Sequence, residues 1–331
     1  MKLHSHAFAA ACLLALFVGA GCRNQALLIQ PVSARRTLEE QVIQKSTGFA
    51  RGKVAVIDVD GILANHAKSG LLGRSDNPVS LFMEKLAKAS ADKDVKAVVL
   101  RINSPGGTIG ATDAMHHALT RFKQETGKPV IASMLDLGAS GGYYLACGAD
   151  GIVAMPSCVT GSIGVILQTM SFEGTLNKIG AKAVAIKSGE LKAMGSPLKN
   201  MEETERDVLH RIIMSQYHIF LDVVAKARPD IPEARLRSLA DGRIYTAGQA
   251  LDAGLIDQIG YPEDAIEWAK REAGLSRCHV VIYHRPVDYK PNSYSTALSP
   301  IGSGALVNVG LPHWLTASGP QFLYMWQPEM E

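Results

Sequence analysis

Short runs of apolar, often β-branched residues alternate along the chain with stretches in which apolar positions recur every three or four residues. The apolar runs predict strands over residues 54–59, 98–102, 130–134, 152–155 and 183–186. The stretches between them predict helices over residues 79–91, 111–125, 140–149 and 172–179, followed by a long helix over 203–227. Strands that alternate with helices are typical of a mostly parallel sheet covered by helices. The pattern therefore predicts an α/β fold.

The C-terminal third has a different pattern. Residues 232–273 predict three short helices, and residues 279–284 predict one more strand. The last 47 residues are rich in Pro, Gly, Ser and Asn and contain an apolar, aromatic patch over residues 321–326. Such a tail cannot form a core of its own. We expect it to pack on its own domain or on a neighbour, or to stay mobile, and the patch to dock on a neighbour or occlude a groove.

The N-terminus has the pattern of an export signal. Lys2 precedes an apolar run that ends in the small residues Ala20 and Gly21, directly before Cys22. At about 14 residues this run is short for a membrane span of about 20. Small residues before a Cys resemble the bacterial lipobox, in which that Cys is lipidated, although Gly19 stands where Leu is usual. The alternatives to lipidation of Cys22 are a plain cleaved signal and an uncleaved anchor. In all three cases we expect the folded part to lie outside the cytoplasm, in the cell envelope.

The composition excludes a disordered tail protein, a collagen-like fibre and a polytopic membrane protein. The chain has 331 residues, 47% hydrophobic and 20% charged, with a net charge of +3, which is ordinary for a globular protein. No run of basic residues indicates nucleic acid as a partner. The cysteines that remain after the signal and Cys22 are Cys147, Cys158 and Cys278, without the spacing of a disulfide framework or a metal site. We expect buried, apolar roles for Cys147 and Cys158, and neither a metal nor a cofactor.

Two glycine-rich turns carry the first chemical signal. Residues 103–107, Asn-Ser-Pro-Gly-Gly, follow a predicted strand and precede a predicted helix, so bare backbone there can approach a ligand and stabilise negative charge. Residues 137–144 place Ser140 between glycines at the start of a helix, where its hydroxyl can act as a nucleophile. The string from Gly138 to Gly142 also fits the nucleophile elbow of α/β-hydrolases. Two other interpretations remain open: residues 103–107 as an ordinary turn between strand and helix, and Ser140 as a helix N-cap.

A serine nucleophile needs a base, and the histidines do not provide an evident one. No His falls between His117 and His210, and His116 and His117 lie within a predicted helix, where a place on the helix face is the better interpretation. The loop over residues 187–197 contains lysines between Gly and Ser residues. A lysine can act as a general base where its surroundings favour the uncharged amine, and otherwise such a lysine is simply solvated.

Four strings in order, INSPGG (102–107), LGASGGYYLA (137–146), TGSIGV (160–165) and KSGELKAMGSP (187–197), resemble the S49 family of serine peptidases, the bacterial signal peptide peptidases. The resemblance covers roughly residues 54–274. It implies an S49 peptidase domain over residues 52–275, after a signal over 1–21 and a tether over 22–51, with an extension over 276–331. It also implies the fold of Clp proteases and crotonases, with repeated ββα units, a mostly parallel sheet and additional C-terminal helices.

The resemblance further implies a role for each motif residue. Ser140 would be the nucleophile and Lys192, 52 residues later, its general base, with Ser162 orienting the lysine. Gly106, Gly107 and Gly141 would form the oxyanion hole. Short members of the family share active sites between protomers, which implies a homo-oligomer. Peptides would be the substrates, in particular cleaved signal peptides or other apolar segments near a membrane to which the chain is anchored.

Other functions remain open at this stage. Residues 58–61, Asp-Val-Asp-Gly, are similar to the nucleophile motif of haloacid dehalogenase phosphatases, but no later acidic pair accompanies them, and a turn at the end of a strand is the better interpretation. Acyl-CoA chemistry of the crotonase type would need a cytoplasmic pool of CoA. An esterase of the α/β-hydrolase type and a catalytically inactive envelope scaffold are the remaining alternatives.

Overall fold

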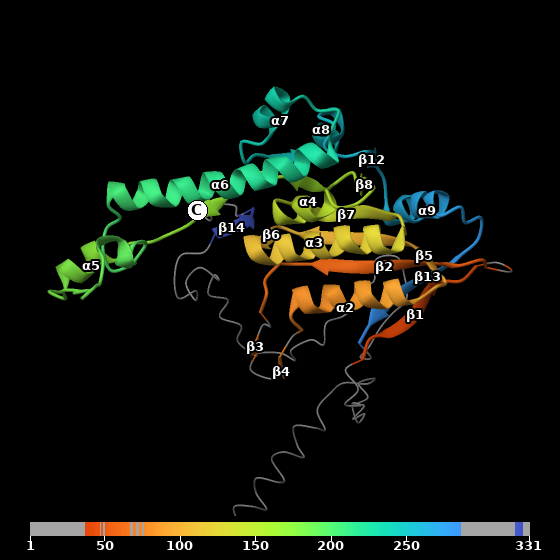
Figure 1. The fold of residues 1–331 in the computed structure, drawn as a ribbon, viewed down its shortest axis with the longest axis horizontal. Coiled ribbons are helices and arrows are strands. Elements are labelled where there is room, and N and C mark those ends of the chain that lie inside the picture. The colour runs from red at the N-terminus through yellow and green to blue at the C-terminus, as the bar shows by residue number, and fades with distance from the viewer. Residues whose placement is uncertain are drawn as a thin grey trace, which may run out of the picture. The chain divides into compact units, whose positions relative to one another are not determined.

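The fold is built on a mixed sheet whose centre is parallel (Figure 1). The computed structural model describes residues 37–285 apart from residues 47, 49, 67–68, 71–72 and 75, together with residues 322–326. The predicted signal and Cys22 lie outside the described residues. Among the helices that are described, none has the length and apolar character needed to cross a bilayer.

The strands of the main sheet follow the order β1-β13-β2-β5-β7-β8-β12. Strand β1 pairs antiparallel with β13, and the pairs from β13 to β12 are parallel. Strand β9 continues the sheet beside the end of β7 and pairs with β11. The bounds of these strands are β1 Glu39–Gln44, β2 Lys53–Asp60, β5 Val95–Ser104, β7 Val130–Ala139, β8 Gly151–Ala154, β9 Val159–Gly161, β11 Ile244–Thr246, β12 Gln258–Ile259 and β13 His279–His284.

Helices cover both faces of this sheet. On one face α2, α3, α4 and α6 pack on alternate strand residues such as Ala55, Ile57 and Val59. On the other face α9 packs on the residues between them, such as Val54 and Val56. The helices are α2 Pro78–Ala91, α3 Ile109–Thr126, α4 Gly141–Ala146, α5 Glu173–Lys178, α6 Glu203–Ala227, α7 Glu233–Leu239, α8 Ala247–Asp252 and α9 Pro262–Glu272, with a 3-10 helix, η1, over Glu190–Ala193.

Two small sheets accompany the main sheet in the described part of the chain. One has the order β10-β14-β6, and the other pairs β3 with β4. Strand β14, from the C-terminal patch, thus lies between two strands that belong to much earlier parts of the chain. The bounds are β3 Ser69–Gly70, β4 Gly73–Arg74, β6 Gly106–Thr108, β10 Ile166–Leu167 and β14 Phe322–Met325.

The predicted α/β fold with a mostly parallel sheet is confirmed, with one wrong strand. Residues 183–186 form no strand, and Val184 and Ile186 are almost fully exposed. Residues 183–186 are apolar, but no neighbouring strand pairs with them to supply the hydrogen bonds that a strand requires. The sheet also reaches beyond both ends of the predicted domain, because β1 falls in the segment expected to be a tether and β13 in the expected extension.

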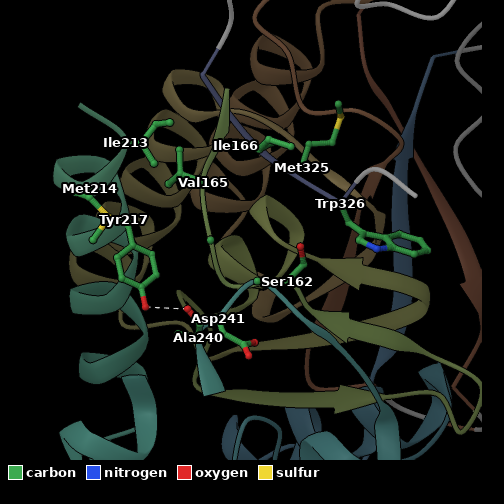
Figure 2. A pocket seen from close by; sticks show the side chains of 12 residues that line it. Ser162, Val165, Ile166, Ile213, Met214, Tyr217, Ala240, Asp241, Met325 and Trp326 are labelled. Atoms are coloured by element: carbon green, nitrogen blue, oxygen red, sulfur yellow. Dashed lines mark hydrogen bonds between the residues drawn. The ribbon is translucent and has the colours of Figure 1, made fainter. Parts of the chain in front are cut away.

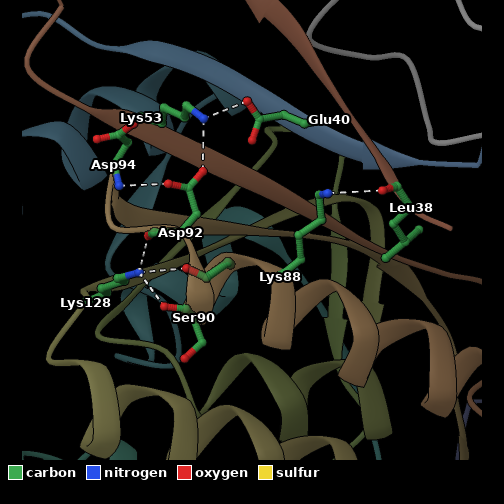
Figure 3. Close-up of polar contacts among 9 residues, drawn as sticks. Leu38, Glu40, Lys53, Lys88, Ser90, Asp92, Asp94 and Lys128 are labelled. Carbon is green, nitrogen blue, oxygen red and sulfur yellow. Dashed lines mark hydrogen bonds and ion pairs between the residues drawn. The ribbon is translucent and has the colours of Figure 1, made fainter.

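Lysines tie the edge of the sheet to the end of α2 (Figure 3). The Lys53 ammonium donates to Glu40 of β1 at 2.8 Å and to Asp92, the C-cap of α2, at 2.9 Å. The Lys128 ammonium donates to the carbonyl oxygens of Ala89, Ser90 and Asp92 at 2.7, 3.2 and 2.8 Å. Carbonyl groups at the end of a helix lack partners within the helix, so these bonds stabilise the C-terminus of α2.

Candidate active site

Ser140 stands at the junction of β7 and α4. It is 1% exposed and adopts φ 51° and ψ −115°, a backbone conformation that residues other than glycine rarely adopt. Its backbone N–H donates to Gly161 O at 2.7 Å, and its carbonyl accepts from the Tyr144 N–H at 2.8 Å. Its hydroxyl bonds to no other described residue. The predicted nucleophile is therefore held by its backbone with its side chain unengaged.

Ser162 occupies the corresponding place on the next strand. Strand β9 runs parallel to the end of β7, with Ala139 opposite Gly161, so Ser140 and Ser162 each follow a paired residue. Ser162 has φ 49°, and its N–H donates to Arg243 O at 2.7 Å. In the described part of the chain, Ser140 and Ser162 are the two residues other than glycine with positive φ. Backbone strain of this kind gathers at functional sites, and here it marks the two serines that the motifs singled out.

The glycines of the two predicted turns meet beside Ser140. Gly106 has φ 101°, and a β-carbon placed on it would lie 2.6 Å from Gly141 N. A side chain at this position would push the two turns apart. The Gly106 N–H donates to the Ser104 hydroxyl at 3.1 Å, so within this structure the N–H of Gly141 is better placed than that of Gly106 to serve a ligand. Gly107 lies against Leu63 and pairs with it in an isolated parallel β-bridge.

The C-terminal strand covers these glycines. Strand β14 pairs antiparallel with β6, with Tyr324 opposite Gly107 and Met325 opposite Gly106, and on its other side it pairs with β10. Tyr324 is fully buried, stacks on Tyr144 at 5.3 Å between ring centroids, and donates its hydroxyl to Gln216 O at 2.8 Å. The apolar patch of the tail thus docks on its own chain, along the edge formed by the glycine-rich turn.

Lys192 lies apart from this cluster. It is exposed on η1, within a segment in which no residue from 164 to 194 is buried. Within the described residues its ammonium makes no hydrogen bond or ion pair. Figure 1 shows α5, which belongs to the same segment, beyond the N-terminal end of α6 and away from the sheet. The structure brings Ser140, Ser162 and the glycines together, and it does not join Lys192 to them within one chain.

An apolar cavity of about 540 Å³ opens next to Ser162 (Figure 2). Strand β10, helix α6 and the end of β14 form its walls. The Tyr217 hydroxyl donates to Ala240 O at 2.7 Å, which fixes the ring along one wall. The apolar side chains around it are Val165, Ile166, Ile213, Met214, Met325 and Trp326. Sequence reasoning missed the contribution of α6, although the apolar positions of that helix are spaced as on one helical face.

Other candidate groups are engaged elsewhere. His116 packs edge-on against the Tyr144 ring at 5.0 Å, and its burial lowers the pKa of the imidazole. Asp58 of the Asp-Val-Asp-Gly string is buried in an ion pair with Arg101 at 2.6 Å, which leaves it no freedom to act as a phosphatase nucleophile. In the described residues no group of His, Cys, Asp and Glu side chains could hold a metal ion. Cys147, Cys158 and Cys278 are free and buried.

Comparisons with known proteins identify the family of the chain. The family model of peptidase family S49 matches residues 122–276. The chain is 38% identical over 247 residues to an Enterococcus faecium protein named as signal peptide peptidase SppA, covering 75% of this chain and 69% of that one. A Synechocystis protein named as a protease is 36% identical over 226 residues, covering 68% of this chain and 76% of that one. Protease 4 of Haemophilus influenzae is 34% identical over 219 residues, which are 66% of this chain and 34% of that protein. The chain therefore belongs to peptidase family S49 and is a serine peptidase.

Proposed function

We propose that the protein is an endopeptidase in which Ser140 is the nucleophile and Lys192 the general base. The observation that carries this proposal is the conformation of Ser140. This buried residue at positive φ lies beside Gly106 and Gly141, and its hydroxyl has no hydrogen-bond partner among the described residues. Ser162, on the adjacent strand end, is the residue that orients the lysine amine. The N–H groups of Gly141 and Gly107 stabilise the oxyanion, and Gly106 contributes a bare backbone that lets the two turns approach.

The chemistry follows from these roles. Uncharged Lys192 accepts the Ser140 proton as the Ser140 oxygen bonds to the carbonyl carbon of a peptide, and the carbonyl electron pair moves onto its oxygen. The lysine then gives its proton to the departing amine, which leaves an acyl group on Ser140. Water, deprotonated by the same lysine, attacks the acyl carbon, and the lysine passes this proton to the Ser140 oxygen as the acid is released.

We further propose that Lys192 acts on Ser140 of a second copy of this chain. The segment that carries Lys192 has no core of its own and exposes the apolar residues Ile179, Val184 and Ile186. An apolar surface of this kind is unfavourable in water and marks an interaction site. An amine acts as a general base at neutral pH only where its surroundings favour the uncharged form, and burial against a second copy supplies such surroundings.

Apolar peptides are the proposed substrates, cleaved signal peptides among them. The cavity next to Ser162 is lined mainly by apolar side chains, which favours an apolar substrate side chain. The relative in Enterococcus faecium bears the name of a signal peptide peptidase. A lipid on Cys22 would hold the protein at a membrane of the cell envelope with its active site outside the cytoplasm, and this part of the proposal rests on the N-terminal sequence.

The layout of Clp proteases and crotonases is likewise a proposal. Strand β5, strand β6 and helix α3 follow one another as a ββα unit, and the glycine-rich turn lies inside it. This succession supports the expected repeated units.

Covalent labelling tests the nucleophile directly. The purified protein is incubated with a fluorophosphonate, and the labelled residue is identified by peptide mass spectrometry. We expect one label per chain, on Ser140, and none in Ser140→Ala. Labelling of a different serine in the parent protein, or equal labelling of Ser140→Ala, would contradict the assignment.

A further inference from the structure

Helix α3 contains three threonines, and one of them differs from the others. The Thr120 hydroxyl donates to His116 O at 3.0 Å and the Thr126 hydroxyl donates to Phe122 O at 2.7 Å, each one turn back along the helix. Thr112, in the first turn, makes no such bond. It is 0% exposed, and its hydroxyl has no hydrogen-bond partner among the described residues. A buried hydroxyl without a partner is rare in a folded protein and calls for an explanation.

The position of the Thr112 hydroxyl supplies one. A β-carbon placed on Gly141 would lie 2.7 Å from Thr112 Oγ1 and 3.0 Å from the carbonyl oxygen of Tyr324. The hydroxyl therefore stands against Gly141, on the same side as a carbonyl group of β14. Tyr324 is paired with Gly107 in the β6 ladder, so an extended chain in this slot presents a backbone carbonyl oxygen beside Gly141, the residue that follows Ser140.

We propose that the Thr112 hydroxyl is a third donor of the oxyanion hole, beside the N–H groups of Gly141 and Gly107. This inference rests on the proposed function of Ser140. As the bond between the Ser140 oxygen and the peptide carbon forms, the carbonyl electron pair moves onto the oxygen, and the Thr112 hydroxyl donates a hydrogen bond to it without giving up its proton. A donor already fixed and shielded from water needs no reorganisation when the charge develops, which is the condition under which such donors accelerate a reaction most.

Three variants separate this role from a structural one. Thr112→Val keeps the shape and removes the hydroxyl, Thr112→Ser keeps the hydroxyl, and Thr120→Val makes the same change in the same helix where the hydroxyl is bonded to the backbone. We expect Thr112→Val to lower kcat for an apolar peptide by about 10–100-fold with KM nearly unchanged. Thr112→Ser and Thr120→Val should keep kcat within about threefold of the parent protein, and the affinity for a peptide boronate should fall in Thr112→Val alone.

The outcomes are distinct from those that test the proposed function. If Ser140→Ala abolishes hydrolysis while Thr112→Val keeps the parent kcat, this inference is wrong and the nucleophile stands. If Ser140→Ala remains active, the proposed function is wrong whatever Thr112 does. A loss of kcat in Thr112→Ser as deep as in Thr112→Val would also overturn the inference, since the hydroxyl would then not be what matters. Should Thr112→Val not fold, the Thr112→Ser and Thr112→Cys pair gives the same comparison of a strong and a weak donor.

Discussion

The backbone N–H of Ser140 donates a 2.7 Å hydrogen bond to the carbonyl oxygen of Gly161. This bond joins the ends of β7 and β9 at the level where both strands turn, so Ser140 and Ser162 leave the sheet next to each other. Each of the two adopts a positive φ, which costs on the order of 1–3 kcal/mol per residue. The buried strands around them hold both serines in place despite that cost.

A shared active site predicts complementation between two inactive variants. Ser140→Ala and Lys192→Ala should each be inactive as pure proteins. When the two are mixed, dissociated and reassembled, sites that combine Ser140 of one copy with Lys192 of another should restore about one quarter of the parent activity. Peptide hydrolysis by the mixture measures this. A mixture as inactive as its components, after verified exchange of subunits, would place both groups in one chain.

From the position of strand β14 we predict that the C-terminal tail limits access of substrates to Ser140. Since β14 pairs with both β6 and β10 beside Ser140, a substrate that binds there as an extended strand must displace it. Deleting residues 316–331 should raise kcat/KM for a short apolar peptide several-fold. It should also lower the melting temperature, because Tyr324 and its contacts with Tyr144 and Phe220 are lost. If activity, assembly and melting temperature were all unchanged, β14 would have neither role.

Much of this arrangement follows from the sequence because it is local. Short sequence motifs specify the strand ends and the glycine-rich turns around Ser140 and Ser162. Because neighbouring strands are parallel, their ends lie at the same edge of the sheet. Cys147 and Cys158 are buried, as their apolar surroundings predict.

Pairing between distant segments is what the sequence could not show. Strand β1 mixes polar and apolar residues, and its partner β13 lies more than 230 residues further along the chain. Strand β14 has four residues and pairs with Gly106–Thr108, more than 210 residues earlier. The run over residues 183–186 has the local composition of a strand and no partner, so local pattern alone gave the wrong answer there. The approach of Thr112 to Gly141 depends on the packing of α3 against α4, which no motif encodes.

Burial of the thiols predicts that they resist alkylation. Burial raises the pKa of Cys147 and of Cys158 to about 12 and also raises the pKa of Cys278. At pH 8 the reactive thiolate is therefore scarce and shielded. Iodoacetamide should leave all three unmodified in the folded protein and modify all three in guanidinium, as read by mass spectrometry. Rapid modification of Cys147 or Cys158 under native conditions at pH 8 would be inconsistent with this burial.

The contacts of Lys128 predict a loss of stability on its replacement. Lys128→Met removes donors to three carbonyl oxygens at the C-terminal end of α2. We expect the free energy of unfolding to fall by about 1–2 kcal/mol, because charged donors are lost at a helix C-terminus. Urea unfolding followed by circular dichroism measures the change. Lys93→Met, at an exposed position, is the matched control, and an equal effect of both variants would show that the three bonds contribute nothing specific.

The most direct test of the central claim is hydrolysis of a fluorogenic apolar peptide by the purified 22–331 form, beside Ser140→Ala and Lys192→Ala, from pH 6 to 10. The account predicts a rate that rises on the basic side, as general-base catalysis by an amine requires, and a loss of at least about 1,000-fold in each variant, because the two residues act as one unit. Full activity in Lys192→Ala, or a parent protein that cleaves no peptide at any pH, would contradict a Ser/Lys peptidase.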